Sequence, residues 1–247
     1  NIRRNNLSDF TNIKRNGKIA MKLQDGDDLV GVMPCNETDD VLLATRDGKA
    51  IRFGVDKVRV FRGRDSTGVR GIRLLGNDCV VSMSIINDDI NQFILSVTEN
   101  GYGKRTPVDD YRRSGRGGQG VANIETSKRN GKVMASFAVV DDDQLMLVTN
   151  QGQVIRIRVH GGEGDSIRIA SRKTQGVRLF DVADDDNEKV VSAGLVRETD
   201  DDAASGEGES SDEAGDTYVP PTASYTANED AKNETPDRAD PNEDTLA

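Results

Sequence analysis

The stretch VLLATRDGKAIRF, residues 41–53, places a short turn between two apolar runs rich in β-forming residues. Its turn, Thr-Arg-Asp-Gly, contains the residue types that favour a tight chain reversal. Two such runs joined by a short link with Asp and Gly predict a β-hairpin. The same arrangement recurs in FILSVTENGYGKR at 93–105 and in LMLVTNQGQVIRIR at 145–158. The three turn glycines are separated by 53 and then 51 residues, so the hairpin belongs to a larger repeat.

A second glycine in each copy recurs with nearly the same spacing as the turn glycines. The dipeptide Gly-Val occurs at Gly68, Gly120 and Gly176, and Gly17 lies 51 residues before Gly68 at the same position of an earlier copy. Each of these markers is expected to start a strand. A further apolar strand is expected at 29–33, 79–86, 132–140 and 189–196. Four short strands every 50 residues or so predict an all-β, propeller-like array of blades that bury their faces against each other.

The first copy is shorter than the others. The stretch NIRRNNLSDF, residues 1–10, aligns with AIRFGVDKVRVF at 50–61, so the first hairpin would need residues ahead of Asn1. We therefore expect most of one blade followed by three more, about four blades within residues 1–196. We also expect the sequence to be a fragment of a longer polypeptide.

The net charge of −10 is divided unevenly along the chain. Residues 197–247 contain 16 Asp and Glu against 3 Lys and Arg, whereas residues 1–196 contain 27 acidic and 30 basic residues. The acidic segment has almost no aliphatic residues, so it cannot bury enough apolar surface to offset its chain entropy. It is predicted to be a disordered acidic tail on a mildly basic body.

The sequence offers little catalytic or metal-binding chemistry. It has a single histidine, His160, in a glycine-rich loop, and no Ser/His/Asp or Cys/His set can be assembled around it. The Asp runs at 141–143 and 184–186 fall where turns are expected, and a third run starts the tail. A P-loop for ATP is missing. Cys35 and Cys79 are expected to be reduced core thiols, and no apolar run reaches the 18 residues of a membrane helix, which favours a cytoplasmic protein.

Basic residues recur at equivalent points of each copy. One set follows the three hairpin turns: Lys49, Arg52, Lys104, Arg105, Arg156 and Arg158. In the first copy, Arg3 and Arg4 occupy the equivalent positions. A second set lies in the long loop before each glycine marker: Lys14, Arg15, Arg62, Arg64, Arg112, Arg113, Arg116, Arg168, Arg172 and Lys173. In a ring of blades, equivalent positions share one rim, so the rim would carry a continuous basic track. Such a track suits the phosphates of duplex DNA, and the few nearby aromatics argue against base stacking.

The loop RRSGRGGQG, residues 112–120, concentrates three of these arginines among four glycines. Arginine forks match phosphate oxygens, and glycines let backbone N–H groups approach a phosphate closely. Arg112, Arg113, Arg116 and Gln119 are predicted to contact the DNA backbone, with Gly117, Gly118 and Gly120 shaping the loop. This interpretation makes it a rim loop for DNA instead of a nucleotide cradle.

Several strings closely resemble the C-terminal domain of DNA gyrase A subunits: RNGKIAMKL, DGDDLVGV, STGVRGIRLLGNDCVVSM, TENGYGKRTPVDDY and KTQGVRLFDVADDDNEKVVS. The resemblance covers about residues 1–196, and the acidic tail is also typical of the family. It implies a six-bladed β-pinwheel, a disc whose blades exchange strands and whose basic rim wraps duplex DNA. The 112–120 loop is similar in composition to the family's Gln-Arg-Arg-Gly-Gly-Lys-Gly box, which belongs to an earlier blade than this one.

The resemblance further implies a role within a whole enzyme, the bacterial type II topoisomerase that introduces negative supercoils. That enzyme contains two A and two B subunits and uses ATP and Mg²⁺ through the B subunit. No cofactor, metal or catalytic residue is expected in this stretch. Three alternatives stay open: the C-terminal domain of the topoisomerase IV A subunit, a propeller that serves as a protein-interaction scaffold, and an RGG-type RNA binder.

Overall fold

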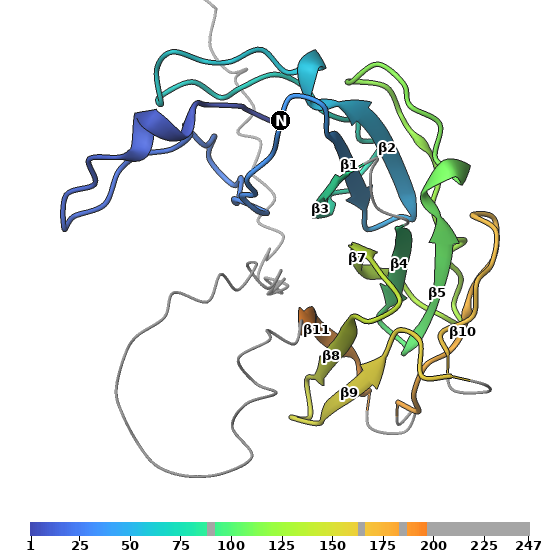
Figure 1. The fold of residues 1–247 in the computed structure, drawn as a ribbon. Helices are drawn as coiled ribbons and strands as arrows, with labels where there is room; N and C mark the ends of the chain where they lie inside the picture. The colour runs from blue at the N-terminus through green and yellow to red at the C-terminus, as the bar shows by residue number, and fades with distance from the viewer. Residues whose placement is uncertain (88–91, 163–165, 183–186, 197–247) are drawn as a thin grey trace, which may run out of the picture.

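The computed structural model describes residues 1–87, 92–162, 166–182 and 187–196, and these residues form an all-β array arranged along an arc (Figure 1). Unit one is residues 1–36. Unit two contains strands β1 to β3, unit three contains β4, β5 and β7, and unit four contains β8, β9 and β11. The units follow one another around the arc in chain order. The predicted acidic tail, 197–247, lies outside the described residues.

The three predicted hairpins are confirmed. They pair β1 (Asp40–Thr45) with β2 (Lys49–Gly54), β4 (Phe93–Thr98) with β5 (Tyr102–Pro107), and β8 (Gln144–Thr149) with β9 (Val154–Arg158). In each turn the glycine amide donates to the threonine carbonyl, at 3.0–3.1 Å. The threonine hydroxyl accepts the amide of Lys49 in the first turn and of Gln153 in the third, at 3.2 Å each. The repeated Thr-x-x-Gly string is therefore the turn chemistry itself.

The third strand of each unit follows a long loop and returns to the inner edge of its own hairpin. β3 (Val80–Ile86), β7 (Val133–Val139) and β11 (Val190–Val196) pair antiparallel with β1, β4 and β8. They confirm the strands that the apolar runs at 79–86, 132–140 and 189–196 predicted. Figure 1 shows these three strands on the inner side of the arc. Short 3₁₀ turns follow the second strands: η2 (Val55–Lys57), η3 (Val108–Asp110) and, in unit one, η1 (Leu7–Phe10).

The fourth strand of each of the two four-stranded sheets comes from the next unit. β6 (Val121–Ala122) of unit three pairs with β2, and β10 (Val177–Arg178) of unit four pairs with β5. The resulting sheet orders are β3-β1-β2-β6, β10-β5-β4-β7 and β11-β8-β9. Val69 of unit two bridges Ile2 of unit one in the same way. Gly120 and Gly176 thus start strands that cross to the preceding unit, which is the exchange of strands that the resemblance implied. Gly68 starts only an isolated bridge and Gly17 starts no strand, contrary to the prediction for these two markers.

Glycine is required at the three Gly-Val markers for a steric reason. Gly68, Gly120 and Gly176 have φ of 73–78°. A Cβ built on them would lie 2.4, 2.3 and 2.6 Å from the carbonyl oxygens of Ile2, Ala50 and Gly103. Only glycine fits a positive φ and a backbone approach this close.

The apolar core lies between neighbouring sheets. One cluster joins unit two to unit three through Leu42, Ile86, Ile94 and Ala138, and a second joins unit three to unit four through Leu95, Leu145 and Leu147. At the inner edge, serines link β3 to β7: the amides of Ser136 and Ala138 donate to the hydroxyls of Ser82 and Ser84, at 3.2 and 3.3 Å. These small side chains let the inner strands approach closely while their polar groups stay satisfied.

Unit one differs from the prediction of a four-stranded blade. Residues 29–33, predicted as a strand, form none, and the unit contains only η1 and the isolated bridges of Ile2 and Arg4. In the other units the corresponding strand pairs with the first strand of a hairpin, and residues 1–36 form no hairpin. Leu29 and Val32 are consequently more than half exposed. Cys35, predicted to lie in a core, is exposed in the same unit, and Cys79 is half-buried.

Replacing Gly120 with alanine should destabilise the protein by roughly 2 kcal/mol or more, because the new Cβ meets the Ala50 carbonyl and loosens β6 from β2. Gly117 is a matched control in the same loop. Its φ is +81°, but the nearest atom to its Cβ would be 3.6 Å away. Gly117→Ala should therefore cost only the left-handed backbone penalty of about 1 kcal/mol. Urea unfolding of both variants measures the difference, and equal losses would show that the contact with Ala50 contributes nothing.

Candidate nucleic-acid interface

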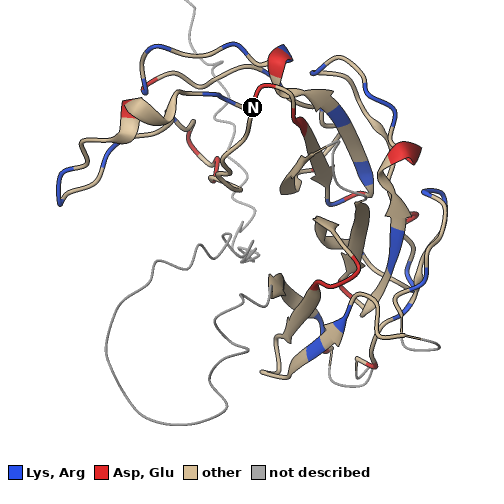
Figure 2. Cartoon of the chain, in the orientation of Figure 1, with Lys and Arg blue, Asp and Glu red and all other residues tan. Residues whose placement is uncertain are grey.

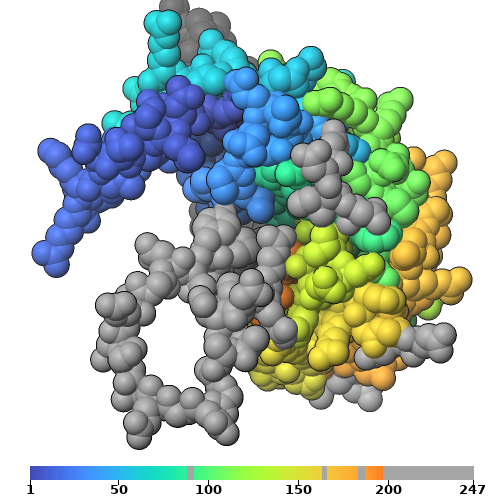
Figure 3. All heavy atoms as spheres, viewed as in Figure 1, coloured from blue at the N-terminus to red at the C-terminus, as the bar shows by residue number. Residues whose placement is uncertain are grey.

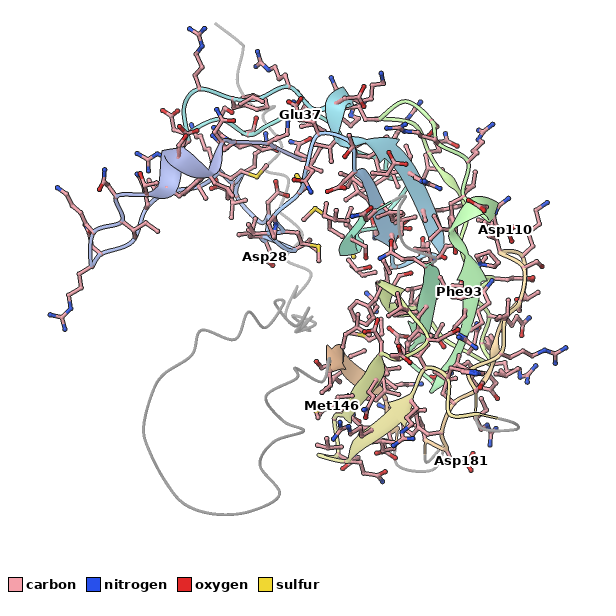
Figure 4. The ribbon with its side chains drawn as sticks, in the orientation of Figure 1. Asp28, Glu37, Phe93, Asp110, Met146 and Asp181 are labelled. Atoms are coloured by element: carbon pink, nitrogen blue, oxygen red, sulfur yellow. The ribbon has the colours of Figure 1, made fainter. Side chains whose placement is uncertain are left out.

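The outer loops run along the convex side of the arc (Figure 1). In units two and three they connect the 3₁₀ turn to the third strand, in unit four the loop follows β9, and in unit one it follows η1. They comprise residues 11–28, 58–79, 111–132 and the described part of 160–189. Figure 2 shows Lys and Arg distributed along these loops, whereas β3, β7 and β11 carry neither. The surface continues from one unit to the next around the arc (Figure 3). In Figure 4, nitrogen-tipped side chains extend from the loops away from the sheets.

Most of the basic residues predicted for the rim are exposed. The exposed members are Lys14, Arg15, Lys49, Arg62, Arg112, Arg113, Arg116, Arg156, Arg158, Arg168 and Lys173. Arg3, Arg4, Arg64 and Arg172 are half-buried. The loops also expose basic residues that the repeat did not single out, because they fall outside the repeated strings: Lys22, Lys57, Arg59, Arg70, Arg73, Lys128, Arg129, Lys132 and Arg178.

Three predicted rim residues, Arg52, Lys104 and Arg105, are instead buried. They lie on β2 and β5, where the loop of the next unit covers the second strand. Arg52 pairs with the buried Asp40 carboxylate at 2.7 Å and donates to the Val108 carbonyl at 3.3 Å. Their positions differ from the exposed track that we predicted. The physical reason is the exchange of strands, which carries a later part of the chain over them.

Arg52, Arg105 and Arg156 occupy equivalent positions on the second strands of their hairpins, although only Arg156 is exposed. Arg52, Arg105 and Arg156 each contact the first residue of the preceding strand. In unit two that residue is Asp40, an ion-pair partner. In unit three it is Phe93, whose ring centroid lies 5.1 Å from the Arg105 guanidinium carbon (Figure 4 labels Phe93). Arg105 instead donates hydrogen bonds to the Ile167 carbonyl, at 2.7 Å, and to the Asp141 carboxylate.

The glycine-rich loop at 112–120 lies over unit two. Arg113 pairs with Asp40 through Nε, 2.8 Å from Oδ1, and the Ser114 amide donates to the Arg52 carbonyl at 2.9 Å. Arg112 is exposed and makes no ion pair or hydrogen bond within the described residues. Arg113 thus contacts unit two, whereas Arg112 is directed to solvent.

Beside this loop, a small cavity of about 160 Å³ is lined by Lys49, Arg73, Gln119, Gly120 and two aspartates. Ligand pockets for molecules of nucleotide size usually have volumes of 300 Å³ or more. Gln119 is exposed at its edge, and a Cβ added to Gly118 would lie 3.7 Å from its nearest neighbour, the Ile51 side chain. A second, open hollow of about 450 Å³ lies at the same loop and is lined by Lys57, Arg113, Ser114 and Gly115, so the assignment of the loop to DNA instead of a nucleotide stays a prediction.

Lys104 is a buried lysine on β5, at the position that isoleucine occupies in units two and four, as Ile51 and Ile155. Its Nζ donates a hydrogen bond to the carbonyl of Ser171, an exposed residue. Two residues further along β5, the Thr106 hydroxyl donates to the Ala170 carbonyl at 2.8 Å. Burial is the main cause that lowers the pKa of Lys104, to about 8, and the nearby Arg172 charge lowers it further. Lys104 thus holds the loop of unit four from beneath, at an electrostatic cost.

Other chemistry on the described residues is sparse. Residues 1–87, 92–162, 166–182 and 187–196 contain no group of three His, Cys, Asp or Glu side chains placed to hold a metal ion. The ring of His160 lies 2.6 Å from the hydroxyl of Ser166, six residues away within one exposed loop. Over the same described residues, none of the helices has the length and apolar character needed to cross a membrane. The Asp runs at 184–186 and 200–202 lie outside the described part.

Comparison with known proteins matches this architecture to one family. The family model of the DNA gyrase C-terminal domain, a beta-propeller, matches residues 1–36, 39–87, 92–139 and 143–197. The DNA gyrase A subunit of Rickettsia bellii is 39% identical over 248 residues, covering 82% of this chain and 27% of the relative. The chain therefore spans about a quarter of the length of the curated relatives it matches.

Two solved structures are similar in fold. A DNA gyrase A C-terminal domain superposes with a TM-score of 0.65 at 25% identity, covering 76% of this chain and 59% of that chain. The C-terminal domain of a DNA topoisomerase IV gives 0.64 at 25% identity, with coverage of 72% and 52%. The two folds are equally similar, so the family model and the sequence relatives decide between them.

Replacing Lys104 with isoleucine should stabilise the protein by roughly 1–3 kcal/mol at pH 7, because a charged group no longer has to be desolvated. The folded-state pKa of about 8 lies below the ordinary 10.5, so the unfolded chain binds more protons between these values. Stability of the unsubstituted protein must then rise with pH through that window. The advantage of Lys104→Ile should be full below pH 8 and vanish above pH 10.5.

Urea unfolding across pH 7 to 11 measures this effect, with the exposed Lys49→Ile as control. The control should change stability by less than about 0.5 kcal/mol at every pH. A gain from Lys104→Ile that is independent of pH would mean that the charge is not what costs stability.

Proposed function

The chain belongs to the DNA gyrase C-terminal domain family, and we propose that it binds duplex DNA along its outer loops and wraps it. The observation that carries this proposal is the recurrence of exposed basic residues on the convex side of successive units (Figure 2). A duplex that follows the arc would meet this surface at unit after unit. The contacts would be made to phosphates, so they would be tolerant of base sequence.

Wrapping requires many such contacts. Smooth elastic estimates for bending 20–30 bp of DNA by 40–90° are roughly 1–6 kcal/mol, and following an arc of several units requires more than one such bend. One arginine cannot offset that cost, whereas a series of phosphate contacts can. We assign these contacts to the exposed residues with the fewest protein partners: Lys14, Arg15, Lys49, Arg62, Arg112, Arg158 and Lys173.

Within the A subunit of DNA gyrase, this stretch would serve a type II topoisomerase that introduces negative supercoils. We propose that two B subunits and a second copy of the A subunit complete the enzyme, that ATP and Mg²⁺ act through the B subunit, and that the enzyme works in the bacterial cytoplasm. The absence of a P-loop pattern from this sequence fits such a division of labour. The contribution of this chain would be to hold DNA and give it a path.

A protein-interaction scaffold, the alternative of a different class, would use exposed apolar or aromatic patches on the rim. The exposed charged side chains of the outer loops of units two to four are mostly basic, although Val60, Leu74, Leu75 and Ile169 are also exposed there. This composition favours a polyanion as the partner.

Ligation of nicked circular plasmid in the presence of the protein tests the proposal. We expect a shift of the linking-number distribution that grows with protein concentration and fades as salt rises, because phosphate contacts release counterions. A variant with Lys14, Arg15, Arg112 and Lys173 all changed to glutamine should lose most of the shift. Its folding is checked by its circular dichroism and melting temperature.

Binding without any shift would overturn wrapping while leaving DNA binding intact. Equal affinity of the parent chain and the quadruple variant for duplex DNA would overturn the rim assignment. Preference for single-stranded RNA over duplex DNA would favour an RNA-binding role.

A further inference from the structure

One arginine recurs four residues before each of the three Gly-Val markers: Arg64, Arg116 and Arg172. We call these the junction arginines. Sequence alone placed them among the DNA contacts, together with the other basic residues of their loops. Their surroundings in the structure set them apart from those neighbours.

Each junction arginine donates a hydrogen bond from Nη1 to a backbone carbonyl of the preceding unit. Arg64 reaches the carbonyl of Ile19 at 3.3 Å, Arg116 that of Arg70 at 3.1 Å, and Arg172 that of Ala122 at 2.9 Å. All three acceptors lie two residues after the preceding glycine marker, Gly17, Gly68 or Gly120. The same donor therefore meets the same acceptor at three successive junctions.

A backbone hydrogen bond accompanies each of these contacts. The amide five residues after one marker donates to the carbonyl two residues before the next marker. The pairs are Lys22 to Ser66 at 3.2 Å, Arg73 to Gly118 at 2.8 Å, and Glu125 to Thr174 at 3.0 Å. The outer loops of neighbouring units are thus joined at two points, one through a side chain and one through the backbone.

Two of the three junction arginines, Arg116 and Arg172, make a further contact. Arg116 also donates through Nε to the Lys57 carbonyl at 3.0 Å, so two edges of its guanidinium face protein oxygens. Arg172 lies over the ring of Tyr111, with 6.0 Å between its guanidinium carbon and the ring centroid. Planar, forked arginine fits such paired acceptors, whereas lysine offers a single flexible ammonium. Arg112, four residues from Arg116, has no such partner within the described residues.

We propose that Arg64, Arg116 and Arg172 are positioning residues that fix the angle between adjacent units, and that they do not contact phosphates. In a repeat array a small rotation at each junction accumulates along the whole array. Loosening one junction would therefore change the path of bound DNA more than its affinity. The inference about DNA path rests on the proposed function, whereas the inference about the junction itself does not.

The experiment compares Arg116→Ala, Arg116→Lys and Arg112→Ala in the full chain. Without DNA, hydrogen exchange of the Arg73 and Gly117 amides should become at least tenfold faster in both Arg116 variants and stay unchanged in Arg112→Ala. These amides donate across the junction to Gly118 and Gly71. Should Arg116→Ala fail to fold, Arg172→Lys provides the equivalent comparison at the next junction, read at the Glu125 amide.

With duplex DNA, the slope of log affinity against log salt should fall by about 0.9 in Arg112→Ala, as expected for one lost phosphate contact. It should not change in Arg116→Ala. The linking-number shift per bound molecule should drop at least twofold in both Arg116 variants, since lysine keeps the charge but not the fork. A slope reduced by about 0.9 in Arg116→Ala, or junction exchange that stays slow, would overturn the proposal. Failure of the parent chain to bind or wrap duplex DNA would overturn the proposed function, and the exchange measurement without DNA would still decide the role at the junction.

Discussion

The array depends on one close backbone approach, repeated at each junction. Gly120 and Gly176 pass over the second strand of the preceding hairpin, and Gly68 passes over Ile2 of unit one, with no room for a side chain between the two backbones. This crossing supplies the fourth strand of the preceding sheet. It also carries the segment before the glycine across that sheet and onto the convex side of the molecule. The position of the basic loops is therefore a consequence of where the chain can cross.

The local features of the fold could be predicted from the sequence, because turn chemistry and alternation of apolar runs act over a few residues. The hairpins at 45–48, 98–101 and 149–152 are examples, and so are the third strands. Residues alone did not specify which strand each Gly-Val marker would pair with, since spacing gives the period and not the partner. Residues 29–33 show the same limit, because an apolar run forms a strand only where a ladder partner exists.

The candidate site was predictable as a set of recurring basic residues but not residue by residue. Arg52, Lys104 and Arg105 look like exposed strand ends, yet they are covered by chain about 60 residues later in sequence. Arg112 and Arg116 share one loop and one composition, and only the acceptors around them distinguish a solvent-directed arginine from one bound to carbonyls. Repetition thus identified equivalent positions of successive units, while the contacts at each position decide what its side chain can do.

The sharing of strands between units also determines how such a protein can change in length. Each four-stranded sheet draws three strands from one unit and its fourth from the next, so no boundary in the chain separates such a blade from its neighbour. If a full period is duplicated or lost, every crossing strand still finds the edge of a preceding sheet. This holds at whatever point of the period the duplication or loss begins. An insertion or loss of half a period would leave one strand without a sheet and one edge without a strand. Blade number can therefore vary among relatives in whole steps, and the rim lengthens or shortens by the same step.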